Sequence, residues 1–392
     1  MTTAMTFAAL GVAPDLAAAL AEQGINEPSP IQALTIRDVL AGADVCGKAQ
    51  TGSGKTLAFG LPLLQGAERA DPGRPRALIL VPTRELAVQV HRVLAPLARL
   101  RDLRIRALYG GTAMEPQIKA LRKGVDVVVA TPGRLIDLGD RGELSVGDVR
   151  VVVLDEADRM ADMGFMPQVQ WVLRRLPESH QTLLFSATLD HEVDHLVKRY
   201  LTDPVRHEVE SSQPTVEEMT HRFLFVHQMD KPKVAAAIVR GHDRTLVFTR
   251  TKRGADRLIQ QLLREGVNAG VIHGDLRQKA REKALEDFTA GRLAALVATD
   301  VAARGIHVDD IDVVVHYDPP EDSKGYVHRS GRTARAGQAG VVATLVLWNQ
   351  QLDVERLQKR LGIRQPIVEV FSNDKRLAEL ATWDPAAEPV VA

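Results

Sequence analysis

The chain has 392 residues, which is longer than one ordinary domain and indicates two. Its 50 basic and 50 acidic residues balance, so any nucleic acid must be bound by a local patch and not by an overall positive charge. The single cysteine, Cys46, excludes an internal disulfide and favours a reducing compartment, so a cytoplasmic location is expected. No apolar stretch is long enough to cross a bilayer and the N-terminus lacks a signal-peptide pattern, so no membrane association is expected.

Short apolar runs alternate with amphipathic stretches along most of the chain. In the first half they predict strands at 45–47, 77–81, 105–109, 126–130, 149–154 and 182–185. In the second half they predict strands at 222–226, 245–248, 269–272, 294–298, 313–317 and 341–347. Apolar strands separated by helical patterns are typical of a parallel sheet covered by helices on both faces. The sequence therefore predicts an α/β fold with two tandem domains of this kind.

The alternation breaks at residues 209–219, which read VESSQPTVEEM and contain few apolar residues and a proline. This composition is typical of a flexible linker between domains. The predicted domains therefore cover residues 1–208 and 220–366, with a short tail at 367–392.

Residues 49–56 read AQTGSGKT, follow a predicted strand and open a predicted helix. Glycines let backbone N–H groups close around phosphate oxygens, and the helix N-terminus adds a partial positive charge. Lys55 is expected to reach the β- and γ-phosphates, and Thr56 to place its hydroxyl on magnesium. The alternative, a glycine-rich turn with a chance lysine, is disfavoured by the strand–loop–helix context. The remaining residues expected around the nucleotide are Ala49, which replaces the usual first glycine, Gln50, Thr51, Gly52, Ser53 and Gly54.

Residues 151–158 read VVVLDEAD, so an apolar strand ends in carboxylates at the sheet edge where ligands of such sheets bind. Asp155 is expected to hold magnesium, largely through water, and Glu156 to act as general base on the attacking water. The alternative role, capping the next helix, suits Asp158 alone. Together the two motifs predict binding and hydrolysis of ATP with Mg²⁺.

With these motifs the chain resembles the DEAD-box RNA helicases of superfamily two, from about Phe7 to about Arg360. The resemblance implies that both domains are RecA-like. It also implies that GINEPSPIQ at 24–32 recognises adenine, with the amide of Gln32 reading the base edge and Phe7 stacking on the base.

Several segments resemble the family's contacts to the RNA sugar–phosphate backbone. PTRELA at 82–87, the glycine pair at 110–111 and TPGR at 131–134 each follow a predicted strand, although each alone could be a capped helix start. Backbone contacts carry no sequence information, so binding without sequence preference is expected. The residues implied in RNA binding are Pro82, Thr83, Arg84, Gly110, Gly111, Thr131, Arg134, Thr249, Gln278, Arg281 and Thr299.

HRSGRTARAG at 328–337 resembles the segment that carries the family's arginine fingers, here Arg332 and Arg335; a solvated basic helix is the alternative. The resemblance also counts His328 among the catalytic residues, as a bridge to the first domain's acidic motif and to SAT at 186–188. His307 stands where the family usually has an aspartate on the ATP ribose, so weaker ATP engagement is expected, without loss of activity. The residues implied in coupling hydrolysis to RNA are Asp158, Ser186, Thr188 and Arg329.

The predicted function is that of an ATP-dependent RNA helicase that opens short duplexes locally. ATP and Mg²⁺ are the expected cofactors and RNA the expected partner, with ribosomal particles or the RNA-decay machinery as candidates by family analogy. Two alternatives remain at this stage. One is a DNA helicase of the same superfamily, and the other is an ATP-gated RNA clamp or scaffold that remodels ribonucleoproteins.

Overall fold

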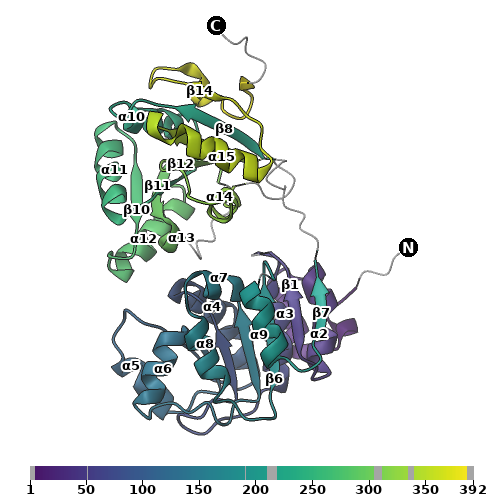
Figure 1. Cartoon of the computed structure of the whole chain (residues 1–392). Coiled ribbons are helices and arrows are strands. Elements are labelled where there is room, and N and C mark those ends of the chain that lie inside the picture. The colour runs from purple at the N-terminus through teal and green to yellow at the C-terminus, as the bar shows by residue number, and fades with distance from the viewer. Residues whose placement is uncertain are drawn as a thin grey trace. The chain divides into compact units, whose positions relative to one another are not determined.

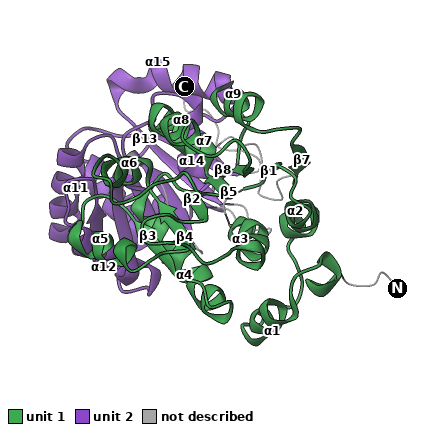
Figure 2. Cartoon of the chain, turned by 90° about the horizontal axis from the view of Figure 1, so that it is seen from below, with its two compact units in different colours: residues 1–211 green, residues 212–392 purple. Residues whose placement is uncertain are grey.

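The structure is a computed structural model that describes residues 5–50, 52–189, 191–209, 219–303, 311–333 and 340–385. The chain divides into two compact units, residues 1–211 and 212–392, which Figure 2 colours separately. The division falls inside the segment predicted as a linker. Because residues 210–218 lie outside the described part, the linker itself stays a prediction.

The first unit is built on a seven-stranded parallel sheet with the strand order β3-β4-β2-β5-β6-β1-β7. Figure 1 labels its strands β1, β6 and β7. Its strands are β1 (Val45–Lys48), β2 (Ala77–Leu80), β3 (Ile105–Leu108), β4 (Val127–Ala130), β5 (Val151–Asp155), β6 (Gln181–Ser186) and β7 (Val205–Glu208). Its helices are α1 (Pro14–Glu22), α2 (Pro30–Leu40), α3 (Lys55–Gly66), α4 (Arg84–Leu100), α5 (Glu115–Arg122), α6 (Pro132–Asp140), α7 (Ala157–Asp162), α8 (Met166–Leu173) and α9 (His191–Tyr200).

Both faces of this sheet are apolar and are covered by helices. Successive strand residues point to opposite faces, so Val45 and Ile79 join one core while Cys46 and Leu78 join the other. Helices α1 to α4 cover the first face and α5 to α9 the second. The predicted α/β fold with helices on both faces is therefore confirmed.

The second unit has the strand order β10-β11-β9-β12-β13-β8-β14. Its strands are β8 (Thr220–Phe225), β9 (Thr245–Thr249), β10 (Ala269–Ile272), β11 (Ala295–Thr299), β12 (Val313–His316), β13 (Val341–Val346) and β14 (Ile367–Glu369). Its helices are α10 (Lys231–Arg240), α11 (Lys252–Arg264), α12 (Gln278–Thr289), α13 (Asp300–Ala303), α14 (Ser323–Ser330) and α15 (Gln351–Leu361). Counted along the chain from the first strand of each unit, the two orders are the same, so β8 occupies the place of β1 and β12 that of β5.

The sequence reading missed the edge strands β7 and β14, although each predicted strand is present. Edge strands pack on one side only, so their apolar pattern is weak: β7 reads VRHE and is partly exposed throughout. Strand β14 pairs with β8, and Leu377 beyond it joins the core of the second unit. The prediction that the second domain ends at residue 366 is therefore wrong, because the segment beyond it is part of the folded unit.

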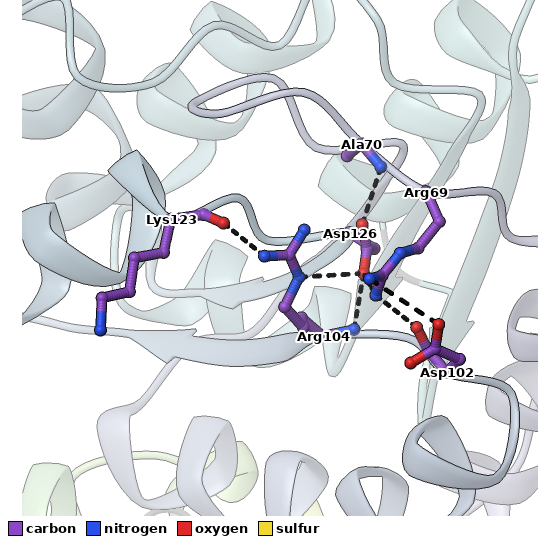
Figure 3. A network of polar contacts seen from close by, with 6 residues as sticks. All are labelled: Arg69, Ala70, Asp102, Arg104, Lys123 and Asp126. Atoms are coloured by element: carbon purple, nitrogen blue, oxygen red, sulfur yellow. Dashed lines mark hydrogen bonds and ion pairs between the residues drawn. The ribbon is translucent and has the colours of Figure 1, made fainter.

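A buried carboxylate organises the sheet edge opposite to the carboxyl ends of the strands (Figure 3). Asp126, just before β4, accepts hydrogen bonds from the backbone N–H groups of Ala70 (2.7 Å) and Arg104 (2.6 Å). It also pairs with the guanidinium groups of Arg69 (3.5 Å) and Arg104 (3.8 Å). One side chain thus joins the segment after α3 to the starts of β3 and β4.

Replacing Asp126 with Ala is expected to lower the free energy of unfolding of the first unit by about 2–4 kcal/mol, because the backbone N–H groups of Ala70 and Arg104 lose their acceptor. Urea denaturation measures this change. Asp102→Asn is the matched control, since that carboxylate is 93% exposed beside the same Arg69 and asparagine tolerates the left-handed φ of 54° at this position. An equal loss in both variants would contradict the role of Asp126.

Candidate functional site: the carboxyl edges of the two sheets

Strands β5, β6 and β1 are neighbours in the first sheet, and all run in the same direction. Their carboxyl ends therefore bring together three segments that are far apart in the sequence: residues 49–56, 155–158 and 186–188. In open parallel sheets this edge is where ligands bind.

Among the described helices, none is long and apolar enough to span a membrane.

The phosphate loop depends on glycine for its backbone and for its packing. Gly52 and Gly54 have φ values of 87° and 90°, in the left-handed region. A Cβ atom on Gly54 would lie 2.5 Å from Nε2 of Gln32 and 2.8 Å from Oγ of Ser29. No other residue fits at Gly54 without displacing these side chains. Thr51, also expected in the loop, lies outside the described residues.

The start of α2 supports the loop through two polar side chains. Ser29 Oγ donates a hydrogen bond to the carbonyl of Ser53 (2.7 Å), and Gln32 Nε2 donates one to the carbonyl of Gly54 (2.9 Å). Gln32 Oε1 accepts from the backbone N–H of Ser29 (2.9 Å), which completes a capping box. Sequence reasoning missed this supporting role, although the spacing of Ser29 and Gln32 was its signal. Adenine recognition by Gln32 stays a prediction.

Phe7 does not present an open ring face in the first unit. Its side chain is 3% exposed and belongs to the core that packs under α1 to α4. A stacked base needs a free aromatic face. Stacking of adenine on Phe7 therefore stays a prediction that requires the ring to be uncovered first.

Two buried charged atoms at this edge have no hydrogen-bond partner among the described residues: Nζ of Lys55 and Oδ1 of Asp155. Their residues are 6% and 3% exposed. Burial raises the pKa of Asp155 to about 7, while Lys55 acts to lower it and Glu156 to raise it. An ammonium and a carboxyl oxygen without hydrogen-bond partners, beside a glycine cradle, fit a magnesium–phosphate ligand, with Lys55 on phosphate oxygens and Asp155 and Thr56 toward the metal.

The raised pKa of Asp155 makes the ligand-free protein less stable as pH rises. The folded state binds this proton more tightly than the unfolded chain, so stability is lost between about pH 4 and about pH 7. Asp155→Asn removes this effect and is expected to raise the free energy of unfolding by about 2 kcal/mol at pH 8 and by little at pH 5. Urea denaturation at both pH values measures the difference. Asp102→Asn serves as the exposed control, and an equal effect of Asp155→Asn at both pH values would contradict the assignment.

Glu156 has a strained backbone at the end of β5. Its φ and ψ are 55° and 51°, a left-handed conformation that costs a non-glycine residue about 1–2 kcal/mol. Its carboxylate is buried, and Oε2 accepts a hydrogen bond from Nη1 of Arg159 at 2.6 Å. Such strain concentrates at functional sites. The sequence reading missed Arg159, which fixes the Glu156 side chain from one turn further along α7.

The acidic segment is hydrogen-bonded to the end of β6 and to the segment that follows it. The backbone N–H of Asp158 donates to Oγ of Ser186 (3.1 Å), and the backbone N–H of Thr188 donates to Oδ2 of Asp158 (3.2 Å). Because β5 and β6 are paired, these contacts need no rearrangement. The part of these residues in coupling stays a prediction.

The other half of the same edge is formed by β3, β4 and β2, and it carries the predicted RNA segments of the first unit. Nη2 of Arg134 donates to the carbonyl of Thr112 (3.1 Å), and its Nε and Nη1 are buried without a partner among the described residues. The guanidinium of Arg84 lies against Gly111, where a Cβ would come within 2.5 Å of Nη1. Both arginines therefore lie beside the segment after β3, Arg84 at Gly111 and Arg134 at Thr112. Pro82 lies in the turn after β2, and Thr131 lies at the start of α6.

Thr83 caps helix α4, which is the alternative to RNA contact that the sequence left open for this segment. Its Oγ1 accepts a hydrogen bond from the backbone N–H of Leu86 at 3.2 Å, at the start of α4. Its hydroxyl hydrogen is still available to a ligand. Capping and RNA contact are therefore compatible for this residue.

In the second unit, β10, β11 and β9 are neighbours and bring together the corresponding predicted RNA residues. Thr299 ends β11, while Gln278 and Arg281 lie on the first turn of α12. Thr249 is fully buried as the last residue of β9, where it pairs with Thr299. Contact of Thr249 with RNA therefore stays a prediction that requires its buried side chain to be uncovered first. The exposed residue that follows it is Arg250.

Helix α14 carries His328 and Arg329, and Arg332 lies two residues beyond its end, after the C-cap Gly331. The guanidinium of Arg329 is buried and donates from Nε and Nη2 to both carboxylate oxygens of Asp300, at 2.6 and 2.7 Å. His328 and Arg332 are partly exposed. Arg335 and His307 lie outside the described residues.

Comparison with known proteins agrees with this site. The family model "DEAD/DEAH box helicase" matches residues 29–196, and "Helicase conserved C-terminal domain" matches residues 230–337. The chain is 38% identical over 388 residues to "ATP-dependent RNA helicase RhlB" of Sodalis glossinidius, covering 96% of this chain and 93% of that protein. The chain belongs to the DEAD-box ATP-dependent RNA helicases.

Further comparisons extend this assignment. This DEAD-box helicase is 41% identical over 381 residues to RhlB of Xanthomonas oryzae, covering 94% of this chain and 66% of that longer protein. Among solved structures, "S. cerevisiae Dbp5 bound to RNA and ADP BeF3" is similar with a TM-score of 0.78 and 29% identity, covering 96% of this chain and 99% of that one. The predicted family, fold and enzyme class, an RNA-stimulated ATPase and helicase, are confirmed. Neither a DNA helicase nor a clamp is favoured by these relatives.

Proposed function

We propose that this helicase completes its ATPase site only when both units bind the same ATP and RNA. The observation that carries the proposal is that two buried polar atoms of the first unit, Nζ of Lys55 and Oδ1 of Asp155, have no hydrogen-bond partner among the described residues. They suit the phosphates and magnesium of a nucleotide. The proposed arginine fingers, Arg332 and Arg335, belong to the second unit, so the first unit holds half of the catalytic groups.

The proposed reaction is in-line hydrolysis of the γ-phosphate. The Glu156 carboxylate takes a proton from water as the water oxygen bonds to the γ-phosphorus, and the bond to the β–γ bridging oxygen breaks, which gives ADP and phosphate. Lys55 holds the β- and γ-phosphate oxygens. Magnesium, when bound through Asp155 and Thr56, would neutralise phosphate charge. The guanidinium groups of Arg332 and Arg335 would stabilise the charge that develops in the transition state.

The strand order of the two sheets supports separate binding places for ATP and for RNA along the sheet edge. In each unit the predicted RNA residues follow the same three topological strands, β3-β4-β2 in the first and β10-β11-β9 in the second. The nucleotide residues of the first unit follow β5, β6 and β1 instead. If each ligand contacts both units, each favours the other's binding, and the coupling is reciprocal. Residues 209–219 would serve as the flexible linker.

ATP-dependent strand displacement on a short duplex tests this function. The expected result is displacement of a short RNA duplex and little displacement of a DNA duplex of the same sequence, because 2′-hydroxyl contacts distinguish the two. Equal displacement of both duplexes would support a DNA helicase. ATP hydrolysis without any displacement would support an ATP-gated clamp.

A further inference from the structure

The shared topology places Lys231 in the second unit where Lys55 stands in the first. Each lysine is the first residue of the helix after the first strand of its unit, α3 after β1 and α10 after β8. Lys231 is 2% exposed. The corresponding acidic residues also match: Asp155 ends β5, and Asp318 follows shortly after β12.

The two lysine–aspartate sets differ in what they bind. Lys55 and Asp155 have unpartnered atoms, whereas Lys231 Nζ donates to Oδ1 of Asp318 at 3.3 Å and lies 4.4 Å from the ring centre of Tyr317. Burial lowers the pKa of Lys231, and Asp318 opposes this shift. The loop that precedes Lys231 reads VHQMD and lacks the glycines of a phosphate cradle. Lys231 therefore interacts with Asp318 and Tyr317 of its own unit and not with a phosphate.

Asp318 joins three segments of the second unit. Its Oδ2 accepts a hydrogen bond from the backbone N–H of Arg250 (2.9 Å), just after β9. Its own backbone N–H donates to the carbonyl of Phe248 (3.2 Å). Its carbonyl accepts from Nη1 of Arg329 (2.7 Å), on α14. Asp318 thus contacts both the RNA side of the sheet and the helix that leads to Arg332.

Three further features connect the position of Asp318 to that of α14. Pro319 and Pro320, both buried, connect it to the helix, and proline fixes the φ angle. Asp322 then caps α14 by accepting from the backbone N–H of Gly325 at 2.6 Å. At the other end of the helix, Arg329 binds Asp300, the residue after Thr299.

We propose that Lys231 is a positioning residue: by holding Asp318 it fixes the RNA-side segments after β9 and β11 against α14, and so transmits RNA binding to Arg332. The inference rests on the proposed function. A buried ion pair is weak evidence for stability, since apolar replacements are often neutral or stabilising. Lys231 is buried and is not preceded by a phosphate loop. Holding Asp318 in place therefore explains this lysine better than a contribution to stability does.

The test is Lys231→Met in the full chain, which removes the charge and keeps the length of the side chain. The RNA-stimulated kcat is expected to fall about tenfold, a change of the size that positions along a coupling network produce, while KM for ATP stays within about twofold. Lys231→Arg keeps the charge and is expected to restore most of the stimulated rate. Lys198→Met is the matched control, because it breaks an exposed lysine–aspartate pair on the last turn of α9 in the first unit, 2.6 Å from Nζ to Asp194 Oδ2.

A charge-balanced double variant separates position from stability. Lys231→Met with Asp318→Asn is expected to restore the melting temperature but not the stimulated kcat. The inference would be overturned if Lys231→Met kept the full stimulated kcat, or if the double variant recovered it. A wild-type rate that RNA does not change would instead overturn the proposed function, and the inference with it.

Discussion

Replacing Arg332 with Ala is expected to lower the RNA-stimulated ATPase rate by about 10³–10⁵-fold, because an arginine finger stabilises charge that exists only in the transition state. ATP binding without RNA should be unchanged, since Arg332 belongs to the second unit and Lys55 and Asp155 to the first. Arg332→Lys should recover little of the rate, because an ammonium lacks the planar fork of guanidinium. Steady-state hydrolysis with and without RNA, and titration of a fluorescent ATP analogue, measure the two effects.

Arg356→Ala is the matched control for Arg332→Ala. Arg356 lies on α15 of the same unit, its side chain is 72% exposed, and its ion pair with Asp353 is a surface contact. Its replacement should change neither hydrolysis nor ATP binding. If Arg332→Ala hydrolysed ATP at the wild-type rate in the presence of RNA, the second unit would not supply the catalytic charge.

Replacing Glu156 with Gln is expected to lower hydrolysis by about 10²–10⁴-fold, because the amide cannot accept the proton of the attacking water. Glutamine keeps the volume of the side chain and one acceptor for Arg159, which donates to Glu156 at 2.6 Å. ATP and RNA should therefore still bind, and RNA should dissociate more slowly when ATP is present. Rapid-quench hydrolysis and RNA dissociation kinetics measure these changes.

Glu178→Gln is the control for Glu156→Gln, because it makes the same chemical change at an exposed position before β6, at the opposite edge of the sheet. Its hydrolysis rate should match that of the wild type. A Glu156→Gln variant that turned over ATP normally would exclude Glu156 as the general base.

The central strands and both halves of the site could be predicted from the sequence because buried parallel strands are continuous apolar runs and their loops carry compact motifs. The edge strands β7 and β14 could not, since a strand covered on one side only has a weak apolar pattern. The burial of a single side chain at the end of a strand could not be predicted from the sequence either. Nothing in the letters distinguishes Thr249, inside the sheet, from the exposed Arg250 beside it.

Tertiary partners account for the other differences. The bond from Gln32 to the carbonyl of Gly54 joins residues 22 positions apart, and the pair of Lys231 and Asp318 joins residues 87 apart. Such contacts follow from strand order, which the sequence reading did not derive. The correspondence between Lys55 and Lys231 became visible only once both sheets were known to have one topology.

The most direct test of cooperation between the two units is the steady-state ATPase rate of the full chain with and without saturating single-stranded RNA. The predicted result is a rate at least about fivefold higher with RNA, the lower end of ordinary coupling between sites. The same rate in both conditions would contradict the dependence of hydrolysis on RNA and on the second unit.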